Sequence, residues 1–188
     1  MKTLLSKAEE SIKKGIKAKT PRLIILMGLP GSGKSYISSY LHEEYGFTVL
    51  SGENITFAIF GTEKCSIDEY ALAYKILRQL AVKLLTDGYS VVIDGTNLKY
   101  AFRQQIYNEV NCNSTTLLYL KVDDKLALNR ISQRGIDFED TKNIKSSISQ
   151  EVFNKFKNSL EEPLPGENAI TIISDDNLFR NIDSIVKL

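Results

Sequence analysis

Residues 28–35 read Gly-Leu-Pro-Gly-Ser-Gly-Lys-Ser, and no other stretch of the chain constrains its structure as strongly. They fit the Walker A (P-loop) pattern G-x-x-x-x-G-K-[ST], with Gly28 and Gly33 at its fixed glycine positions. In this pattern, the backbone N–H groups of a glycine-rich turn and of the following helix N-terminus bind the phosphates of a nucleotide. The lysine reaches the β- and γ-phosphates, and the final hydroxyl binds Mg²⁺. The stretch therefore predicts a nucleoside triphosphate site formed by Gly28, Leu29, Pro30, Gly31, Ser32, Gly33, Lys34 and Ser35.

The segments on either side of this loop have the patterns that the motif requires. Residues 22–27 form a short apolar run typical of a buried parallel strand, and residues 35–45 place apolar side chains at helical spacing. Four further strands are predicted at 46–50, 90–94, 115–122 and 169–173. Further helices are predicted at 53–60, 66–87, 98–110, 123–130, 140–160 and 175–186. Because such alternation produces right-handed crossovers, we expect an α/β fold in which a five-stranded parallel sheet lies between two helical layers.

The composition restricts the chain to a few classes of protein. The 188 residues are 43% hydrophobic, which is enough for one domain with a sizeable core, and the net charge of +1 does not predict a broadly basic surface. Cys65, Cys112 and the single histidine, His42, form no cluster with metal-ligand spacing. Unpaired cysteines are typical of a reducing compartment, so we expect a cytoplasmic protein, and no apolar stretch reaches the length of a membrane span.

The first 20 residues predict a separate amphipathic helix. Apolar side chains share one helical face, lysines are spread over the rest, and the apolar core of a secretory signal is missing. The apolar residues are Leu4, Leu5, Ala8, Ile12 and Ile16. We expect this extension, residues 1–20, to pack on a domain formed by residues 21–188. Contact with a membrane surface or a nucleic acid is the alternative, which Glu9 and Glu10 disfavour because they dilute the positive charge.

In a parallel α/β sheet the ligand lies beyond the carboxyl ends of the strands, and this rule groups polar residues at three strand ends. The phosphate-binding loop follows the first strand, residues 51–53 follow the second, and residues 94–97 follow the third, so we expect all three to line one crevice. Asp94 directly follows an apolar run, as does the Walker B acid that holds Mg²⁺, and Ser35 and Asp94 are therefore the predicted metal-binding residues. The alternative is that Asp94 caps the N-terminus of the next helix.

Glu53 stands just past the second strand, where a carboxylate can accept the proton of a hydroxyl that attacks a phosphoryl group. This position makes Glu53 the predicted general base. The alternative is that Glu53 only complements the dipole of the short helix in which it lies, a contribution of about 0.3–1 kcal/mol.

Arg130 and Arg134 are four residues apart and therefore share a helical face. Two guanidinium groups beside Gly135, ahead of a polar stretch, predict a phosphate clamp on a helical lid at about residues 130–145. Such arginines neutralise charge on the phosphoryl group during its transfer. The alternative is a solvated basic helix end.

Three segments together carry a family resemblance: residues 28–35, residues 91–98 (Val-Val-Ile-Asp-Gly-Thr-Asn-Leu) and residues 128–135 (Leu-Asn-Arg-Ile-Ser-Gln-Arg-Gly). With these segments in this order, the chain resembles the 5′-polynucleotide kinase branch of the P-loop kinases, both the phage type and its small stand-alone bacterial relatives, over about residues 21–175. The resemblance implies the three-layer α/β/α fold of the P-loop NTPase kinase type, with a helical lid. It also implies transfer of the γ-phosphate of ATP, or of another nucleoside triphosphate, to a hydroxyl group, typically the 5′-OH end of RNA or DNA.

The resemblance also implies roles for individual residues. Lys34 and Ser35 would hold the triphosphate and Mg²⁺, Arg130 and Arg134 would be the lid arginines, and Glu53 would be the general base. The predicted catalytic residues are therefore Lys34, Glu53, Asp94, Arg130 and Arg134. The predicted acceptor-binding residues are Glu53, Asp94, Thr96 and Asn97.

Two departures from the family bear on the acceptor. The family has aspartate at the position of Glu53, and three residues later it has an arginine for the acceptor's neighbouring phosphate, where this chain has Thr56. A kinase of a small molecule, such as a sugar, a nucleoside or a nucleotide-sugar, therefore stays open as an alternative. A nucleotide-binding regulatory ATPase that docks through its N-terminal helix is a second alternative.

Overall fold

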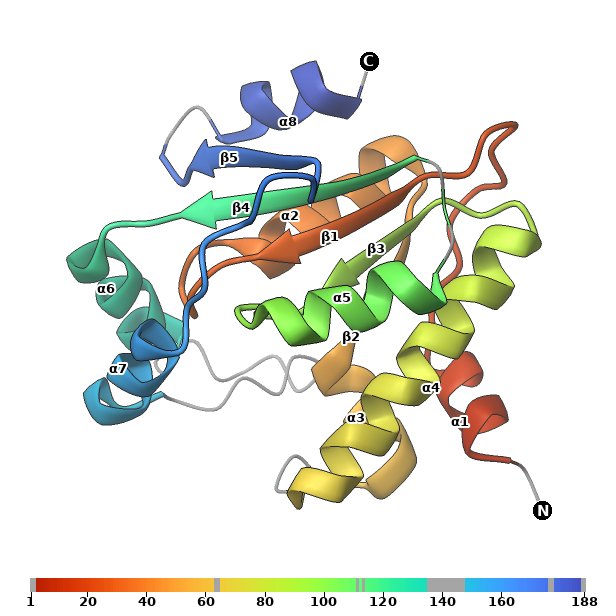
Figure 1. Cartoon of the computed structure of the whole chain (residues 1–188), viewed down its shortest axis with the longest axis horizontal. Helices are drawn as coiled ribbons and strands as arrows, with labels where there is room; N and C mark the ends of the chain where they lie inside the picture. Colours follow the sequence, from red (N-terminus) through yellow and green to blue (C-terminus); the bar gives the residue numbers. More distant parts are fainter. Residues whose placement is uncertain are drawn as a thin grey trace.

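A five-stranded parallel sheet forms the centre of the protein (Figure 1). The computed structural model describes residues 3–62, 65–110, 112, 114–134, 148–175 and 178–186, with only the backbone of residue 134. The strands are β1 (Leu23–Met27), β2 (Thr48–Ser51), β3 (Val91–Asp94), β4 (Thr115–Lys121) and β5 (Ala169–Ile173). Their order across the sheet is β2-β3-β1-β4-β5, and every neighbouring pair is parallel. The loop that follows β1 therefore emerges at the middle of the sheet's carboxyl edge.

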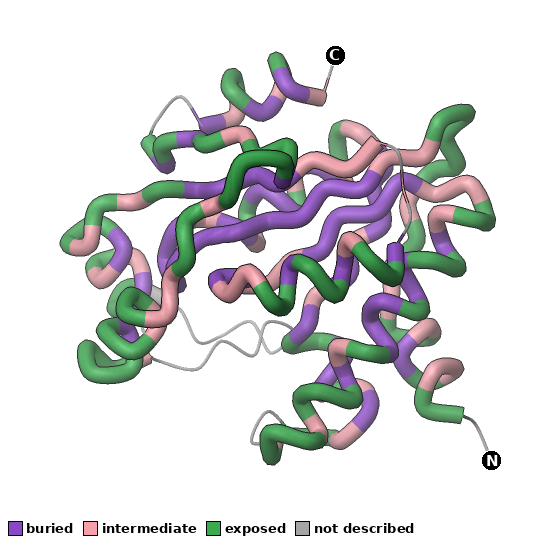
Figure 2. The backbone as a smooth tube through the Cα atoms, viewed as in Figure 1, coloured by how far each residue is buried: buried purple, intermediate pink, exposed green. Residues whose placement is uncertain are grey.

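Helices cover both faces of the sheet, as its strand sequences require. All five residues of β1 are buried, because a parallel strand in the middle of a sheet has a helical layer on each side (Figure 2). One layer, which covers Ile24 and Leu26, contains α2 (Lys34–Tyr45) and α8 (Leu178–Val186). The other layer contains α1 (Leu4–Glu10), α3 (Gly52–Phe60), α4 (Ile67–Thr86) and α5 (Tyr100–Glu109). This arrangement confirms the predicted three-layer α/β/α fold. Past the carboxyl end of β4 lie α6 (Asp124–Arg134) and α7 (Gln150–Asn158) (Figure 1).

Local signals in the sequence set the ends of several helices. The hydroxyl of Ser66 accepts a hydrogen bond from the N–H of Glu69, and the Glu69 carboxylate accepts one from the N–H of Ser66, so a capping box begins α4. Asp123 caps α6, because its carboxylate accepts hydrogen bonds from the N–H groups of Lys125 and Leu126. Gly61 ends α3 in the left-handed conformation, with φ of 73°.

The N-terminal helix is shorter than predicted. α1 packs on α3 and α4 but ends at Glu10, and the chain then runs alongside the start of β2. There the N–H of Gly15 donates to Thr48 Oγ1, and the N–H of Ile16 donates to the carbonyl oxygen of Gly46. The approach is so close that a β-carbon at Gly15 would lie 1.9 Å from that oxygen. Because these hydrogen bonds replace those of a continued helix, the predicted place of Ile16 on a helix is wrong, and its side chain is 74% exposed.

α5 begins later than predicted, at Tyr100 rather than at residue 98, because Asn97 adopts a left-handed φ of 47° and Leu98 is buried against α6 and α7. α7 begins at Gln150 with Ser149 as its N-cap, so the helix predicted at 140–160 is not continuous through residues 148 and 149. The part of that prediction at 140–147 lies outside the described residues. Most of the predicted lid lies outside the described residues.

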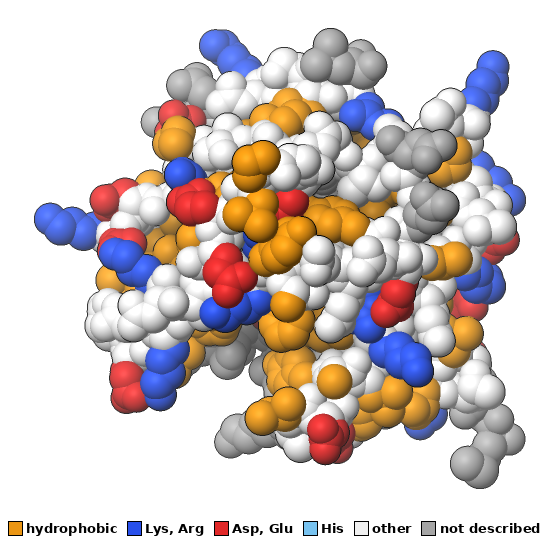
Figure 3. All heavy atoms as spheres, in the orientation of Figure 1, with side chains coloured by type: hydrophobic (Ala, Val, Ile, Leu, Met, Phe, Trp, Pro, Cys, Tyr) orange, Lys and Arg blue, Asp and Glu red, His pale blue; other side chains and the backbone are white. Residues whose placement is uncertain are grey.

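On the face shown in Figure 3, Lys and Arg side chains are scattered around the rim and hydrophobic side chains occupy the middle. This distribution agrees with the small net charge of the sequence. Within the described ranges, no helix is both long enough and apolar enough to cross a membrane.

Candidate active site

The loop between β1 and α2 packs its backbone tightly against neighbouring segments. Gly31 has φ of +81°, and a β-carbon there would lie 2.5 Å from the carbonyl oxygen of Ala127 in α6. A β-carbon at Gly28 would lie 2.6 Å from the carbonyl oxygen of Leu120 at the end of β4. Gly28 and Gly31 are therefore needed for this close approach, which holds the loop between β4 and α6.

The N-terminus of α2 fits an anion. Its N-cap is Gly33, which has φ of 92° and no side chain with which to accept a hydrogen bond from the first turn. The first N–H groups of a helix have no partner within the helix, and together with the helix dipole they bind phosphate groups. The N-terminus of α2 is therefore suited to bind the phosphates of the predicted nucleoside triphosphate.

The Lys34 side chain is folded into the phosphate-binding loop. It is 8% exposed, and its Nζ donates hydrogen bonds to the carbonyl oxygens of Gly28 and Leu29, each at 2.9 Å. Ser32 Oγ lies 3.4 Å from the same nitrogen. A positive charge is therefore held at the centre of the loop, where the β- and γ-phosphates are expected.

Asp94 lies at the end of β3, beside the first turns of α2. Ser38 Oγ is 3.1 Å from Asp94 Oδ2 and 3.0 Å from the carbonyl oxygen of Ser35, so it connects the two predicted metal-binding residues. Hydroxyl and carboxylate oxygens are ligands that Mg²⁺ prefers, and the residues fit the ion. The alternative that Asp94 caps the next helix is wrong, because the N-cap of α5 is Lys99. Within the described residues, no group of three or more His, Cys, Asp or Glu is suited to a metal.

The loop after β3 is bonded to β1 and to the phosphate-binding loop. The N–H of Gly28 donates to the carbonyl oxygen of Thr96 at 3.1 Å. Asn97 is buried, and its Nδ2 donates to the carbonyl oxygens of Leu26 at 2.7 Å and Gly95 at 3.3 Å. The Asn97 amide therefore shapes the loop from inside. Thr96 is partly buried beside it.

A buried ion pair lies behind this loop. Arg103 Nε and Nη2 donate to the two carboxylate oxygens of Glu167 at 2.7 and 2.9 Å, and both side chains are almost fully buried. Tyr107 Oη donates to the same carboxylate at 3.0 Å, and the N–H of Leu164 donates to it at 2.7 Å. Burial alone would raise the pKa of Glu167, but the hydrogen bonds from Arg103, Leu164 and Tyr107 outweigh burial and lower the pKa below its ordinary value.

Arg103, which the sequence did not mark as a functional residue, extends this network to the loop after β3. Its Nη1 donates to the carbonyl oxygens of Asn97 and Leu98 at 3.1 and 3.0 Å. Arg103 shares the buried face of α5 with Ile106. The one sequence signal for this role was a charged residue at an apolar position of the helix predicted at 98–110.

Arg130 braces α6 against the phosphate-binding loop. Its Nη1 donates to Ser174 Oγ at 2.7 Å and lies 3.4 Å from the carbonyl oxygen of Gly31. Arg134 occupies the last position of α6, but its side chain and residues 135–147 lie outside what the structure describes. Arg130, one of the two predicted clamp arginines, therefore lies beside the phosphate-binding loop.

Glu53 lies at the neighbouring strand end. Ser51 of β2 is in register with Asp94 of β3, so Glu53 stands two residues beyond the position opposite Asp94. Its side chain is exposed, in the first turn of α3. By contrast, Thr56 is 1% exposed, and its Oγ1 donates to the carbonyl oxygen of Gly52 at 2.7 Å. Thr56 is therefore buried in the helical layer and not available to a ligand.

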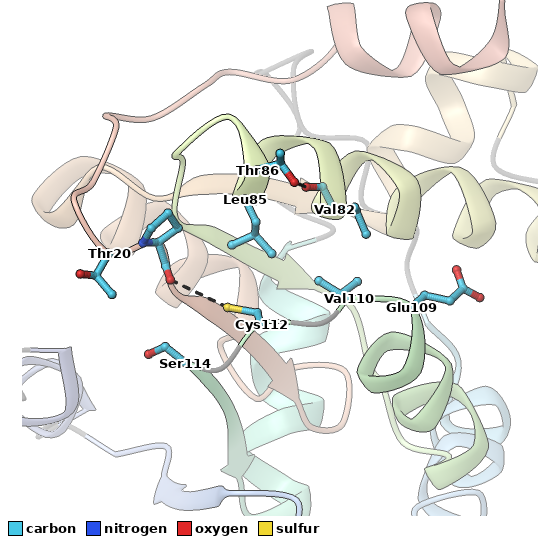
Figure 4. Close-up of a pocket in the computed structure, with 9 residues that line it drawn as sticks. Thr20, Val82, Leu85, Thr86, Glu109, Val110, Cys112 and Ser114 are labelled. Carbon is cyan, nitrogen blue, oxygen red and sulfur yellow. Dashed lines mark hydrogen bonds between the residues drawn. The ribbon is translucent and has the colours of Figure 1, made fainter.

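The pocket drawn in Figure 4 lies at the opposite edge of the sheet and has a volume of about 440 Å³. It is formed before β1, before β4 and near the end of α4. Its lining consists of Thr20, Pro21, Val82, Leu85, Thr86, Glu109, Val110, Cys112 and Ser114. Because ligands of parallel α/β sheets bind beyond the carboxyl ends of the strands, this pocket is separate from the candidate active site.

Solved structures of kinases share this fold. A sugar kinase from Janibacter sp. HTCC2649 has a TM-score of 0.66 at 17% identity, over 89% of this chain and 93% of that one. The APS kinase CysC of Mycobacterium tuberculosis, in complex with AMPPNP and APS, has a TM-score of 0.64 at 14% identity, over 90% of this chain and 98% of that one. A chain of the Pnkp1/Rnl/Hen1 RNA repair complex has a TM-score of 0.61 at 22% identity, over 76% of this chain and 45% of that one. At these identities the likeness shows the fold alone.

None of the curated proteins compared with the chain matches it significantly. The model of the family AAA_33, described as an AAA domain, matches residues 23–163. This range contains the phosphate-binding loop, Asp94 and α6. Since the match covers well over half of the sequence, the chain belongs to the AAA_33 family.

Proposed function

We propose that this chain is an ATP-dependent kinase that transfers the γ-phosphate to a hydroxyl group, in the first place the 5′-OH end of RNA or DNA. The observation that supports it most is the order of three neighbouring strands, β2-β3-β1. It aligns Glu53, Asp94 and the phosphate-binding loop along one edge, with Asp94 in the middle. A proton acceptor, a metal-binding carboxylate and a phosphate-binding loop, placed side by side in this order, suit in-line phosphoryl transfer.

In the proposed reaction, the loop and the N-terminus of α2 bind the triphosphate and Lys34 binds its β- and γ-phosphates. Mg²⁺, held by Ser35 and Asp94, would neutralise charge on the phosphate oxygens. The acceptor oxygen attacks the γ-phosphorus, its proton passes to Glu53, and the bond to the β-phosphate oxygen breaks to release ADP. Arg134 would neutralise the transferring group, while Arg130 keeps α6 on the loop.

The nucleic-acid acceptor is favoured by the motifs at residues 91–98 and 128–135. The structural likeness to a chain of an RNA repair complex agrees with this acceptor, at the level of the fold. A small-molecule acceptor is the second candidate, and the buried Thr56 favours it, because no guanidinium replaces the family's arginine in the described part of α3. The likeness to a sugar kinase agrees with this second acceptor to the same degree.

The test is phosphate transfer from γ-labelled ATP by the purified protein. The acceptors are a 5′-OH oligoribonucleotide, a 5′-OH oligodeoxyribonucleotide, a nucleoside 3′-monophosphate, adenosine and D-gluconate, with a reaction without acceptor. We expect label on an oligonucleotide, and no label with the Lys34→Ala variant. Label on adenosine or D-gluconate alone would select the second candidate. ATP hydrolysis at the same rate with and without every acceptor would contradict a kinase and favour a regulatory ATPase.

A further inference from the structure

α4 brings an aromatic side chain to the acceptor side of the candidate active site. Tyr74 lies at the N-terminal end of the buried stripe of α4 and is itself partly buried. The stripe consists of Ala73, Ile76, Leu77, Leu80, Ala81 and Leu84. α3 and α4 lie side by side (Figure 1), so the second turn of α4 faces the start of α3 at the end of β2.

The Tyr74 hydroxyl lies between the ends of β2 and β3. A β-carbon at Gly52 would lie 2.7 Å from Tyr74 Oη, and a β-carbon at Gly95 would lie 3.3 Å from the same oxygen. Gly52 directly precedes Glu53, and Gly95 directly follows Asp94. The two positions without side chains thus make room for a phenol between the proposed base and the proposed metal-binding acid.

This hydroxyl is a hydrogen-bond donor rather than a base. Burial, and then the nearby Tyr70, Glu53 and Asp94, raise the pKa of Tyr74 to about 12, so the group keeps its proton at neutral pH. The ring of Tyr70 stacks on that of Tyr74 with centroids 6.4 Å apart. Within the described part of the chain, no group accepts a hydrogen bond from Tyr74 Oη. Its donor capacity is therefore available to a ligand.

The carboxylates that raise the pKa of Tyr74 are those of Glu53 and Asp94. α3, residues 52–60, contains no Lys or Arg, and neither do residues 67–74 of α4. Near two carboxylates, a neutral hydroxylated ring is a better ligand than an anion, because it can donate to a carboxylate and accept from a phenol.

We propose that Tyr74 is a specificity-determining residue of the acceptor site, whose hydroxyl donates a hydrogen bond to an uncharged oxygen of a sugar ring in the acceptor. The hydroxyl that becomes phosphorylated then faces Glu53, and the second oxygen of the ring fixes its orientation. This inference rests on the proposed kinase activity. It applies to the terminal ribose of an oligonucleotide as well as to a free nucleoside or sugar.

The test compares Tyr74→Phe with wild type in steady-state kinetics, with the acceptor that wild type labels in the panel above. We expect KM for the acceptor to rise about three- to tenfold, as for the loss of one hydrogen bond, while KM for ATP and the melting temperature stay as in wild type. The acceptor KM of Tyr74→Phe divided by that of wild type is expected to stay constant between about 50 and about 300 mM salt, because the proposed hydrogen bond involves no charge. Tyr89→Phe, in the turn before β3, is the matched control and should leave all values unchanged.

An unchanged acceptor KM in Tyr74→Phe, with wild type active, would overturn this inference and leave the proposed kinase standing. An equal rise in both KM values would overturn it too, because it would indicate a general change in the site. If this ratio falls toward one as the salt concentration rises, the contact is to a charged group, and the inference of an uncharged oxygen is wrong. A wild type that labels no acceptor in the panel would overturn the proposed function and this inference together.

Discussion

Gly28 donates its backbone N–H to the carbonyl oxygen of Thr96 at 3.1 Å, so the first residue of the phosphate-binding loop is bonded to the loop that follows Asp94. Asn97 strengthens the same connection through its hydrogen bond to Leu26, the residue before the end of β1. The loops on the donor side and the acceptor side of the proposed reaction are therefore hydrogen-bonded to each other. Such coupling preserves the short distances that phosphoryl transfer needs.

Lys34→Ala should abolish phosphate transfer while the protein stays folded. Loss of a charge aimed at the phosphates should lower kcat/KM by about 10²-fold or more. Loss of its hydrogen bonds to Gly28 and Leu29 should cost about 1 kcal/mol in the free energy of unfolding. Labelled-ATP assays and urea unfolding measure the two effects, with Lys14→Ala on the exposed surface as the control. A variant with wild-type turnover would show that the loop does not bind the transferred phosphate.

Glu53→Gln should lower kcat by about 10²- to 10⁴-fold with KM for ATP unchanged, because the amide cannot accept the acceptor's proton. Glu53→Asp should keep part of the activity, since it retains a carboxylate at a slightly greater distance. The exposed acid Asp68 in the first turn of α4 provides the control variant Asp68→Asn, which should behave as wild type. Steady-state kinetics with both substrates test this, and a Glu53→Gln enzyme with normal kcat would remove Glu53 from the reaction.

Arg103→Met should destabilise the protein by about 3–5 kcal/mol, because it leaves the Glu167 carboxylate buried without its partner. Lys99→Ala breaks an ion pair with Glu161 in which both side chains are more than 40% exposed, and it should cost no more than about 1 kcal/mol. Urea unfolding compares the two variants. If Arg103→Met cost no more than Lys99→Ala, the buried pair would not contribute to stability.

The stability of the protein should fall on acidification, in part through Glu167. The folded state holds the pKa of Glu167 below the ordinary value of 4.5, so its contribution is complete above that pH and is lost as the pH falls through the folded-state pKa. We expect the double variant Arg103→Met/Glu167→Gln to lose less stability than wild type between about pH 5 and about pH 3. Urea unfolding at a series of pH values measures this difference. If the free energy of unfolding fell equally with pH in the two proteins, the acid sensitivity would come from other carboxylates.

Gly31→Ala should weaken ATP binding, whereas Gly61→Ala should not. Both glycines have positive φ, of 81° and 73°, so both variants should lose about 1–3 kcal/mol of stability from backbone strain. Only Gly31 would also place a β-carbon 2.5 Å from the Ala127 oxygen and push α6 from the loop, because nothing lies within 4 Å of the β-carbon position at Gly61. Calorimetric titration with ATP separates the two effects. Equal ATP affinities would mean that the contact with α6 does not shape the loop.

The parts of the fold that depend on local patterns could be predicted from the sequence. The loop at residues 28–35, the capping box of Ser66 and Glu69, and the strand that ends at Asp94 each depend on neighbouring residues. Contacts between distant segments were missed: Arg103 and Glu167 are 64 residues apart, and no local pattern pairs them. Likewise, the helical periodicity that includes Ile16 is real in the sequence. Hydrogen bonds to the start of β2 nevertheless outcompete the helix, because tertiary contacts override a weak local preference.

The ammonium group of Lys34, already surrounded by oxygens of its own loop, makes nucleotide binding a ligand exchange. An incoming anion has to supply enough oxygens to replace those of Gly28, Leu29 and Ser32, and a polyphosphate chain does this where a single small anion offers fewer at once. We therefore expect the loop to select ligands by the number of oxygens that they offer as well as by their charge. Abundant monovalent anions should then compete poorly with the oxygens of the loop for Lys34.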